Sequence, residues 1–242
     1  MLDLQNLKKA FGGHVAVEDL SFTLAKGEVL GFLGQNGAGK STTMRMVSGV
    51  LEPDAGDAVV NGHSIISARR EAQSQIGYLP EGAPLYRDMT PLTFLRFMAD
   101  AHDLSRIARK EAVDRVIADA RIANVATKQI ATLSKGYRRR VGLAAAIIHD
   151  PPVLLLDEPT DGLDPIQKRA VRALVARMAP EKAIVISTHT LEEVPAMCSR
   201  VIVIDKGKTV ADDTPDALAS RKPGGLEEVF ISLADRREVA RT

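Results

Sequence analysis

In its N-terminal third the chain reads Gly34-Gln35-Asn36-Gly37-Ala38-Gly39-Lys40-Ser41, which fits the pattern G-x-x-x-x-G-K-[ST] at every fixed position. Glycines let such a loop wrap tightly around an anion, so that successive backbone N–H groups point at phosphate oxygens. Lys40 adds a positive charge for the β and γ oxygens of a nucleotide, and the Ser41 hydroxyl is suited to bind Mg²⁺. The motif therefore predicts a loop that holds the phosphates of a nucleotide.

The residues on both sides of this loop support the prediction. The apolar run Val29–Leu33 precedes it and indicates a buried strand, and a helix is expected from Lys40 to about Ser48. The N-terminal end of that helix would favour negative charge. A glycine-rich turn without a ligand is the alternative, but the four fixed positions coincide by chance in only about one chain in a hundred of this length. The phosphate-binding interpretation is therefore preferred.

Composition sets the bounds for the rest of the chain. The 242 residues suffice for one large domain or two small ones, and a net charge of +1 gives no electrostatic reason to expect nucleic-acid binding. The single cysteine, Cys198, excludes an internal disulfide framework and suits a reducing compartment. The longest apolar run, Val141–Ile148, is too short to span a bilayer, and no signal peptide is expected at the N-terminus. Any role at a membrane would therefore require a partner chain.

The N-terminal third is predicted to be rich in strands. Leu2–Leu4 and Phe22–Leu24 alternate between apolar and polar residues, and Val59-Val60 runs into Asn61-Gly62, a strong hairpin signal. We expect antiparallel strands that flank the strand before the phosphate loop.

The middle of the chain, from Pro84 to His149, is predicted to be helical. Thr90 offers a helix cap followed by proline, and a second amphipathic helix is expected over Glu111–Ile122. The basic run Arg106–Lys110 between these helices is interpreted as a solvated connector.

The last third returns to short apolar strands that alternate with helices. A helix is expected over Pro165–Met178, capped by Asp164. The strands expected around it each end in a polar residue, and they cover Val153–Leu156, Ala183–Ile186 and Val201–Ile204. This alternation predicts a parallel sheet with its polar residues at the carboxyl ends, where ligands bind.

Two adjacent acids, Asp157 and Glu158, end the first of these strands. Asp157 suits the second Mg²⁺ ligand that a phosphate-loop enzyme needs, and Glu158 is the candidate to orient or deprotonate an attacking water. An isolated acid pair would equally suit a solvated strand end. Beside a phosphate loop, the catalytic interpretation is favoured.

Further motifs give the chain a resemblance to the nucleotide-binding subunit of an ATP-binding cassette (ABC) transporter. The match runs from about Leu2 to Thr214, with motif order and spacing as in that family. After the phosphate loop, the resembling segments are Ile76–Glu81 (the Q-loop), Leu133–Tyr137 (the signature), Val153–Thr160 (Walker B), Gly162–Asp164 (the D-loop) and Ser187–His189 (the switch). Similarity is greatest to ATPases of type-2 exporters, which implies export.

The resemblance implies a fold class and a division of the chain. The expected α/β fold has a mixed parallel sheet core, an N-terminal antiparallel β subdomain and an inserted α-helical subdomain. Residues 1–220 would form the ATPase domain, with 1–84 and 150–220 as its core and 85–149 as the helical part. Residues 221–242 would form a C-terminal helix and tail.

The resemblance also implies the residues of the site. Glu158, His189 and Lys40 would be catalytic, and Mg²⁺ would be held by Ser41, Asp157 and Glu81. ATP would be contacted by Phe11, Gly34, Asn36, Gly37, Ala38, Gly39, Lys40, Ser41, Thr42, Glu81, Ser134, Gly136 and Asp157. Phe11 takes the position of an aromatic that stacks on adenine in the family, usually tyrosine. The remaining histidines are interpreted as structural or surface residues: His14, His63, His102 and His149.

Two partners follow from the same resemblance. In the family, the signature residues, here Ser134 and Gly136, close over ATP held by a second subunit. The chain would therefore pair with a second nucleotide-binding subunit, a copy of itself or a related chain. An integral-membrane permease would be the other partner, at the cytoplasmic face of a bacterial inner membrane.

The chain departs from the general family pattern at three positions. Glu81 stands where glutamine is usual, so a carboxylate would face the Mg²⁺. Lys135 and Tyr137 replace a glycine and a glutamine of the signature. Neither change removes the hydroxyl of Ser134 or the amide of Gly136.

Three other functions were weighed against a transporter ATPase. A soluble ABC ATPase would act in regulation or macromolecular assembly without a membrane channel. A GTPase or small-molecule kinase would share the phosphate loop, but the chain has no Asn-Lys-x-Asp guanine motif. A non-catalytic nucleotide-gated module is disfavoured by the presence of both Asp157 and Glu158.

Overall fold

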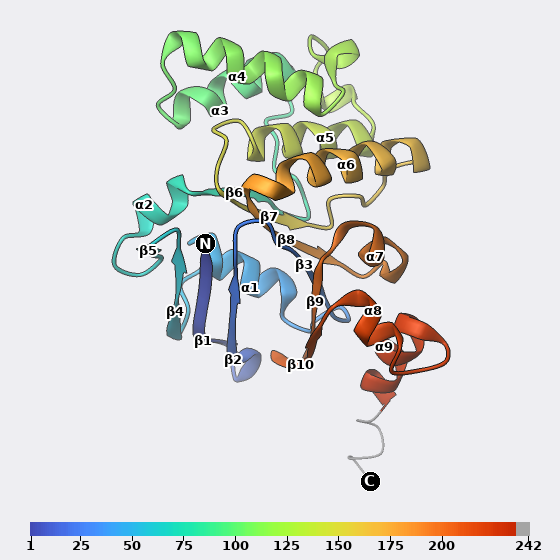
Figure 1. Cartoon of the computed structure of the whole chain (residues 1–242). Coiled ribbons are helices and arrows are strands. Elements are labelled where there is room, and N and C mark those ends of the chain that lie inside the picture. The colour runs from blue at the N-terminus through green and yellow to red at the C-terminus, as the bar shows by residue number, and fades with distance from the viewer. Residues whose placement is uncertain (236–242) are drawn as a thin grey trace.

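The computed structural model describes residues 1–235, which form two sheets with helices between and beside them (Figure 1). The first sheet is antiparallel, and its order is β2-β1-β4-β5. Its strands are β1 (Leu2–Phe11), β2 (His14–Leu24), β4 (Ala55–Val60) and β5 (His63–Ser64). Asn61 and Gly62 both have positive φ angles, 49° and 89°, as the tight turn of a β-hairpin requires. The predicted hairpin is confirmed.

The second sheet has the order β10-β9-β3-β8-β7-β6, and all its neighbouring pairs are parallel except β10 with β9. Its strands are β3 (Val29–Leu33), β6 (Ile76–Leu79), β7 (Val153–Asp157), β8 (Ala183–Thr188), β9 (Arg200–Asp205) and β10 (Lys208–Asp213). The predicted parallel sheet is therefore confirmed, with its strand ends at one edge.

The predicted N-terminal antiparallel subdomain is confirmed, and its strands flank the phosphate-loop strand in sequence but do not pair with it. β3 pairs with β8 and β9, and the antiparallel strands form a sheet of their own. The reason lies in burial. Every residue of β3 is buried, as in a parallel strand covered on both faces, whereas β1 and β2 mix buried with exposed residues.

Helix α1 (Lys40–Val47) lies between the two sheets (Figure 1). Its Met44, Met46 and Val47 share a buried cluster with Leu4 of β1 and Phe32 of β3. The helix that follows the phosphate loop is thus held from both sides, which fixes the position of its N-terminal end. The other face of the parallel sheet is covered by a second cluster, to which α5 (Lys135–Ala146) and α6 (Pro165–Met178) contribute.

The middle of the chain is helical, as predicted. α3 (Pro91–Ala101) is capped by Thr90, and α6 by Asp164, whose side chains accept hydrogen bonds from backbone N–H groups. The interpretation of Arg106–Lys110 as a connector is wrong, because these residues form the first turns of α4 (Arg106–Asp119). The Ser105 hydroxyl caps this helix, and arginine and lysine have high helix propensity.

The remaining helices are short or lie near the end of the described chain: α2 (Arg69–Ser74), α7 (Val194–Met197), α8 (Pro215–Ala219) and α9 (Gly225–Asp235). The expected C-terminal helix thus corresponds to α9, while residues 236–242 of the expected tail lie outside the described residues. The division into a core and a helical part over residues 85–149 stays a prediction. None of the helices between residues 1 and 235 combines the length and the hydropathy needed to cross a bilayer.

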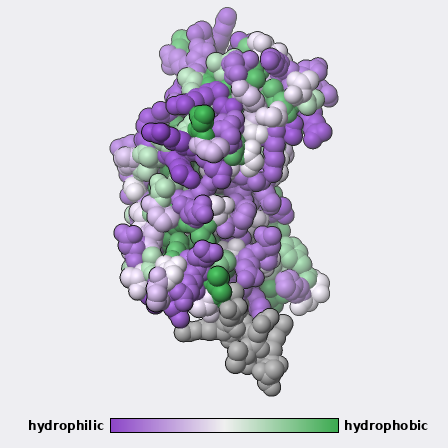
Figure 2. Space-filling view, turned by 90° about the vertical axis from the view of Figure 1, so that its right-hand side faces the viewer, coloured by the Kyte–Doolittle hydropathy of each residue, from purple (hydrophilic) through white to green (hydrophobic). Residues whose placement is uncertain are grey.

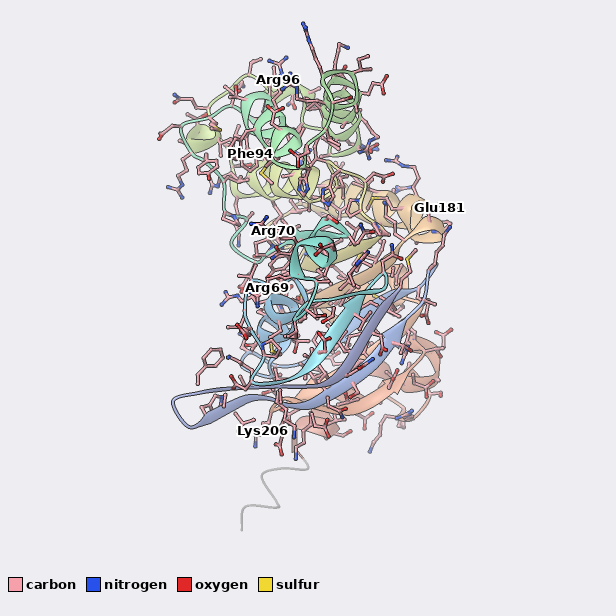
Figure 3. All side chains as sticks on the ribbon, turned by 90° about the vertical axis from the view of Figure 1, so that its left-hand side faces the viewer. Arg69, Arg70, Phe94, Arg96, Glu181 and Lys206 are labelled. Atoms are coloured by element: carbon pink, nitrogen blue, oxygen red, sulfur yellow. The ribbon has the colours of Figure 1, made fainter. Side chains whose placement is uncertain are left out.

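Two opposite sides of the molecule are seen in Figures 2 and 3. In Figure 2 most of the visible surface is hydrophilic, and hydrophobic residues form separate small patches. On the opposite side, Arg69 of α2 and Arg96 of α3 lie on one face (Figure 3). A groove of about 400 Å³ opens between α2 and α3, with Val50, Tyr78 and Met98 in its lining.

Two histidines stack in the wall of this groove. The rings of His102 and His149 lie parallel, with centroids 3.6 Å apart, and His149 Nε2 is 3.2 Å from the Ile76 carbonyl oxygen. Burial lowers the pKa of His149 to about 4, and the neighbouring His102 adds to the effect. Burial also lowers the pKa of His102. Both rings are therefore neutral near pH 7, in agreement with a structural role.

Acid should destabilise the fold through this pair. His149 titrates near 6.5 when unfolded and near 4 when folded, so the unfolded chain binds more protons between those values. Stability is consequently lost as pH falls through this window, by about 1–2 kcal/mol at pH 5 after allowing for partial exposure of the ring. Between pH 7.5 and pH 5.0, the melting temperature of His149→Phe should fall less than that of the unaltered chain. His63→Phe is the control, and an equal loss in all three would contradict the assignment.

Candidate functional site

The phosphate loop connects β3 to α1 and depends on glycine at two close approaches. A Cβ atom on Gly34 would lie 2.5 Å from the Ile204 carbonyl oxygen. Gly39 has a φ of 109°, and a Cβ there would collide with the Ala16 carbonyl oxygen. Only glycine avoids both problems. The loop is thereby packed against β2 and β9, with its amides at the start of α1.

Lys40 lies at the first position of α1 and is only 8% exposed. Its Nζ donates hydrogen bonds to the carbonyl oxygens of Gly34, at 2.6 Å, and Gln35, at 3.1 Å. Burial lowers the pKa of Lys40, and the carboxylates of Glu158 and Asp157 oppose that shift. The ammonium group is thus held by the loop itself, beside the strand-end acids.

A pocket of about 450 Å³ opens above this loop. It brings together eight of the predicted nucleotide contacts, Phe11, Asn36, Gly37, Gly39, Lys40, Ser41, Thr42 and Glu81. Phe11 is 47% exposed, so its ring is accessible for stacking. The pocket is therefore polar along the loop and aromatic at one end, as a nucleotide requires.

His14 and Ala16 also line the pocket, and sequence reasoning missed both. Their signal was the Gly12-Gly13 turn, because a tight hairpin there sets the first residues of β2 beside Phe11 at the end of β1. His14 is exposed, which agrees with its interpretation as a surface residue, and it also borders the pocket.

The other predicted contacts lie outside this pocket. Gly34 and Ala38 belong to the loop but do not line the cavity, and Asp157 is buried below it at the end of β7. Ser134 caps α5, where its hydroxyl accepts a hydrogen bond from the Tyr137 N–H. Gly136 follows in the first turn, and neither signature residue lines the pocket.

The signature lies against the D-loop of the same chain. A Cβ on Gly136 would be 2.6 Å from Gln167 Oε1 of α6, so the two helices approach closely here. Lys135, one of the departures from the family pattern, has its Nζ 2.8 Å from Asp161 Oδ2. This hydrogen bond lowers the pKa of Asp161. The Lys135 stem also packs on Gly162, where the φ of 71° favours glycine.

The acid pair is set by the register of β7 and β8, in which Asp157 is opposite Ser187. The Ser187 hydroxyl donates a hydrogen bond to Asp157 Oδ1, and Asp157 is 2% exposed. Glu158 has a φ of 52°, an uncommon angle for a residue with a side chain, and its N–H donates to the Ser187 carbonyl oxygen at 3.0 Å. This strained turn separates the directions of the two carboxylates.

Glu158 and His189 are brought into contact, since His189 directly follows β8. The distance from His189 Nδ1 to Glu158 Oε1 is 2.8 Å. Burial raises the pKa of Glu158, and the hydrogen bond from His189 opposes the rise. A carboxylate with a raised pKa is a better proton acceptor than an ordinary glutamate. The pair can therefore orient and deprotonate a small nucleophile.

The Q-loop segment is tied to the signature helix. Arg139 of α5 donates hydrogen bonds to the carbonyl oxygens of Pro80, at 2.6 Å, and Glu81, at 2.8 Å. Arg139 is buried, and its Nε has no hydrogen-bond partner within residues 1–235. The Glu81 side chain is left to face the pocket.

The comparisons with known proteins agree with this geometry. The family model of the ABC transporter matches residues 17–161. The uncharacterized ABC transporter ATP-binding protein YhcH of Bacillus subtilis is 38% identical over 218 residues, which cover 87% of this chain and 68% of the relative. The Nod factor export ATP-binding protein I of Burkholderia lata is also 38% identical, over 92% of this chain and 74% of the relative.

A solved structure of the ATP binding subunit of an ABC transporter has the same fold. It has a TM-score of 0.88 and 28% identity, and the alignment covers 97% of this chain and 99% of that one. The fold class predicted from the motifs is thus confirmed. Since the family model spans more than half of the chain and both relatives exceed 30% identity, the chain belongs to the ABC transporter family, as an ATP-binding subunit that hydrolyses ATP.

Proposed function

We propose that two nucleotide-binding subunits, two copies of this chain or one copy and a related chain, enclose two Mg·ATP between them and drive export through a separate integral-membrane permease. The lining of the nucleotide pocket supports the pairing of two subunits. The pocket over the phosphate loop is lined by the β1–β2 hairpin, the loop itself and Glu81, and neither Ser134 nor Gly136 belongs to its lining. The start of α5, capped by Ser134, would be a second anion-binding position. Pairing would place the start of α5 of one subunit over the nucleotide pocket of the other.

In this proposal each copy supplies different groups to each ATP. Phe11 stacks on the adenine, and the loop amides from Gly34 to Ser41 hold the phosphates together with Thr42. Ser134 and Gly136 of the second copy close over the γ-phosphate. Lys40 and His189 stabilise the negative charge that develops there during hydrolysis.

Glu158 acts on the attacking water. Its carboxylate, hydrogen-bonded to His189 at 2.8 Å, accepts a hydrogen bond from the water and takes its proton as the bond to phosphorus forms. The raised pKa of Glu158 favours this transfer. His189 keeps the carboxylate oriented, so the water approaches in one direction.

The oxygen atoms around the pocket fit Mg²⁺. Ser41 offers a hydroxyl and Glu81 a carboxylate in the lining of the pocket, and Asp157 offers a carboxylate at the end of β7, where it acts on the charge of Lys40. Mg²⁺ prefers such hard donors together with substrate phosphates. We assign Ser41, Asp157 and Glu81 as the residues that would hold the ion. When bound, Mg²⁺ neutralises charge on the phosphates. The Ser187 hydroxyl orients Asp157 for this role.

The permease would dock in the groove between α2 and α3. Val50, at 69% exposure, and Met98 line the groove. The exposed rings of Tyr86 and Phe97, with centroids 5.5 Å apart, add apolar surface on the segment that leads to Met98. The segment from Glu81 to Met98 connects this groove to the nucleotide pocket, and would pass the opening and closing of the pair to membrane helices. Residues 85–149 would move as one unit at the cytoplasmic face of the inner membrane. Export is supported by the relative named for Nod factor export.

Co-purification distinguishes this proposal from the alternative, a soluble ABC ATPase that acts in regulation or macromolecular assembly. The tagged chain, extracted from its own cells in detergent, should carry a multi-span membrane chain with it. Val50→Asp should lower the recovery of that chain at least tenfold, because a buried unpaired carboxylate is costly at an apolar interface. Ile107→Asp is the matched control, since Ile107 is 74% exposed outside the groove. Recovery of an active ATPase alone would favour the soluble alternative.

A further inference from the structure

Glu193 is a buried carboxylate near the site that the mechanism above leaves without a role. It ends a short 3₁₀ turn, Leu191–Glu193, and its side chain is 2% exposed. A charge is rarely buried so completely unless it is paired. The Thr160 hydroxyl donates a hydrogen bond to its Oε2, and Lys168 Nζ lies 2.8 Å from its Oε1. Arg172 approaches the same oxygen at 3.6 Å.

The partners of Glu193 come from both sides of the hydrolysis site. Thr160 lies two residues after Glu158, in the turn that leaves β7. Lys168 and Arg172 lie on α6, the helix that begins directly after the D-loop residue Asp164. One carboxylate thus joins the strand-end turn, the D-loop helix and the segment that follows His189.

Two links connect the same pair of segments. The outer link joins Glu158 to His189, whose side chain is 61% exposed, and the inner link joins Thr160 to Glu193. The inner link is buried, and a hydrogen bond to a charged acceptor is among the stronger kinds. His189 and Thr190 form the short connection between the end of β8 and the turn that carries Glu193.

We infer that Glu193 is a positioning residue that fixes His189 against Glu158, an inference that rests on the proposed roles of those two residues in ATP hydrolysis. β8 anchors the connection before His189, and Glu193 anchors it behind. Loss of the inner link would free one end, and the imidazole would move relative to the carboxylate. Because Lys168 and Arg172 bind the Glu193 carboxylate, α6 is held in place against the turn after β7 and the segment after His189.

Steady-state kinetics of the purified full chain test this inference. Glu193→Gln should lower kcat about tenfold with little change in the KM for ATP, since small misplacements of catalytic groups cost rate rather than binding. Thr160→Val, which removes the inner link from its other side, should have a similar effect, and Thr160→Ser should restore the rate. Glu192→Gln, at the neighbouring exposed carboxylate, is the matched control and should leave both constants unchanged.

A double-mutant cycle separates positioning from simple support of the fold. His189→Ala should itself slow hydrolysis, and Glu193→Gln should then cost nothing further, because Glu193 acts through His189. If Glu193→Gln lowers kcat as much in the His189→Ala background as in the unaltered chain, the inference is overturned. It is also overturned if unfolding at the assay temperature explains the lower kcat of Glu193→Gln. If Glu193→Gln fails to fold, the cycle with Thr160→Val gives the same decision. A normal rate for His189→Ala would instead remove the proposed role of His189, and the inference with it.

Discussion

Replacing Glu158 by glutamine should lower kcat at least 100-fold while ATP remains bound, because the amide cannot accept the proton of the attacking water. The substitution preserves size and the hydrogen bond with His189, so the strained turn at Glu158 should persist. Since hydrolysis is what separates the pair, the variant should accumulate as an ATP-bound dimer. Phosphate release measures the first effect, and light scattering with and without ATP measures the second.

Asp161, the acid directly before the D-loop, supplies the control. Asp161→Asn also removes one carboxylate close to the site, but Asp161 pairs with Lys135 rather than with His189. We expect a much smaller loss of rate and no trapped dimer for this variant. Near-normal turnover by Glu158→Gln would show that another group activates the water.

Mixing two inactive variants should restore ATP hydrolysis to about one quarter of the normal rate. Lys40→Met removes the charge that holds the phosphates, and Ser134→Phe blocks the signature, so each homodimer has two defective sites. In a mixed pair, one site collects both defects, while the other combines an intact loop with an intact signature. Random pairing makes half of the dimers mixed, each with half of its sites intact.

The control for mixing is a chain that carries both substitutions. Combined with Lys40→Met, the Lys40→Met/Ser134→Phe chain cannot form an intact site, and the rate should stay at background. The absence of rescue in the first mixture, with pairing verified by light scattering, would mean that Ser134 acts within its own chain. ATPase activity at several mixing ratios would distinguish these outcomes.

The chemistry of the site could be predicted from sequence where it is encoded locally. The loop from Gly34 to Ser41 is such a case, because the glycines that the packing requires are also those that define the motif. The contact of Glu158 with His189 was implied only by family resemblance. It arises because β7 and β8 are neighbours in a parallel sheet, and no local pattern determines which strands become neighbours.

Features that depend on distant partners were missed or misread. Alternation along β1 and β2 predicted strands but not their pairing partners, which lie in a sheet separate from that of β3. The basic run Arg106–Lys110 was interpreted as a connector, whereas the Ser105 cap makes it the start of α4. Glu193 gave no signal at all, as its burial depends on Thr160, Lys168 and Arg172 from two other elements.

The hydrogen bonds that Lys40 makes to its own loop bear on how nucleotide comes and goes. The ammonium group has three N–H donors, and the Gly34 and Gln35 carbonyl oxygens take two of them. One donor can therefore meet a phosphate oxygen without rearrangement, whereas a second phosphate contact requires that a bond to a loop carbonyl be given up. That second contact adds less affinity than the first, since one strong acceptor replaces another, so a closely packed phosphate loop can still release ADP once per turnover.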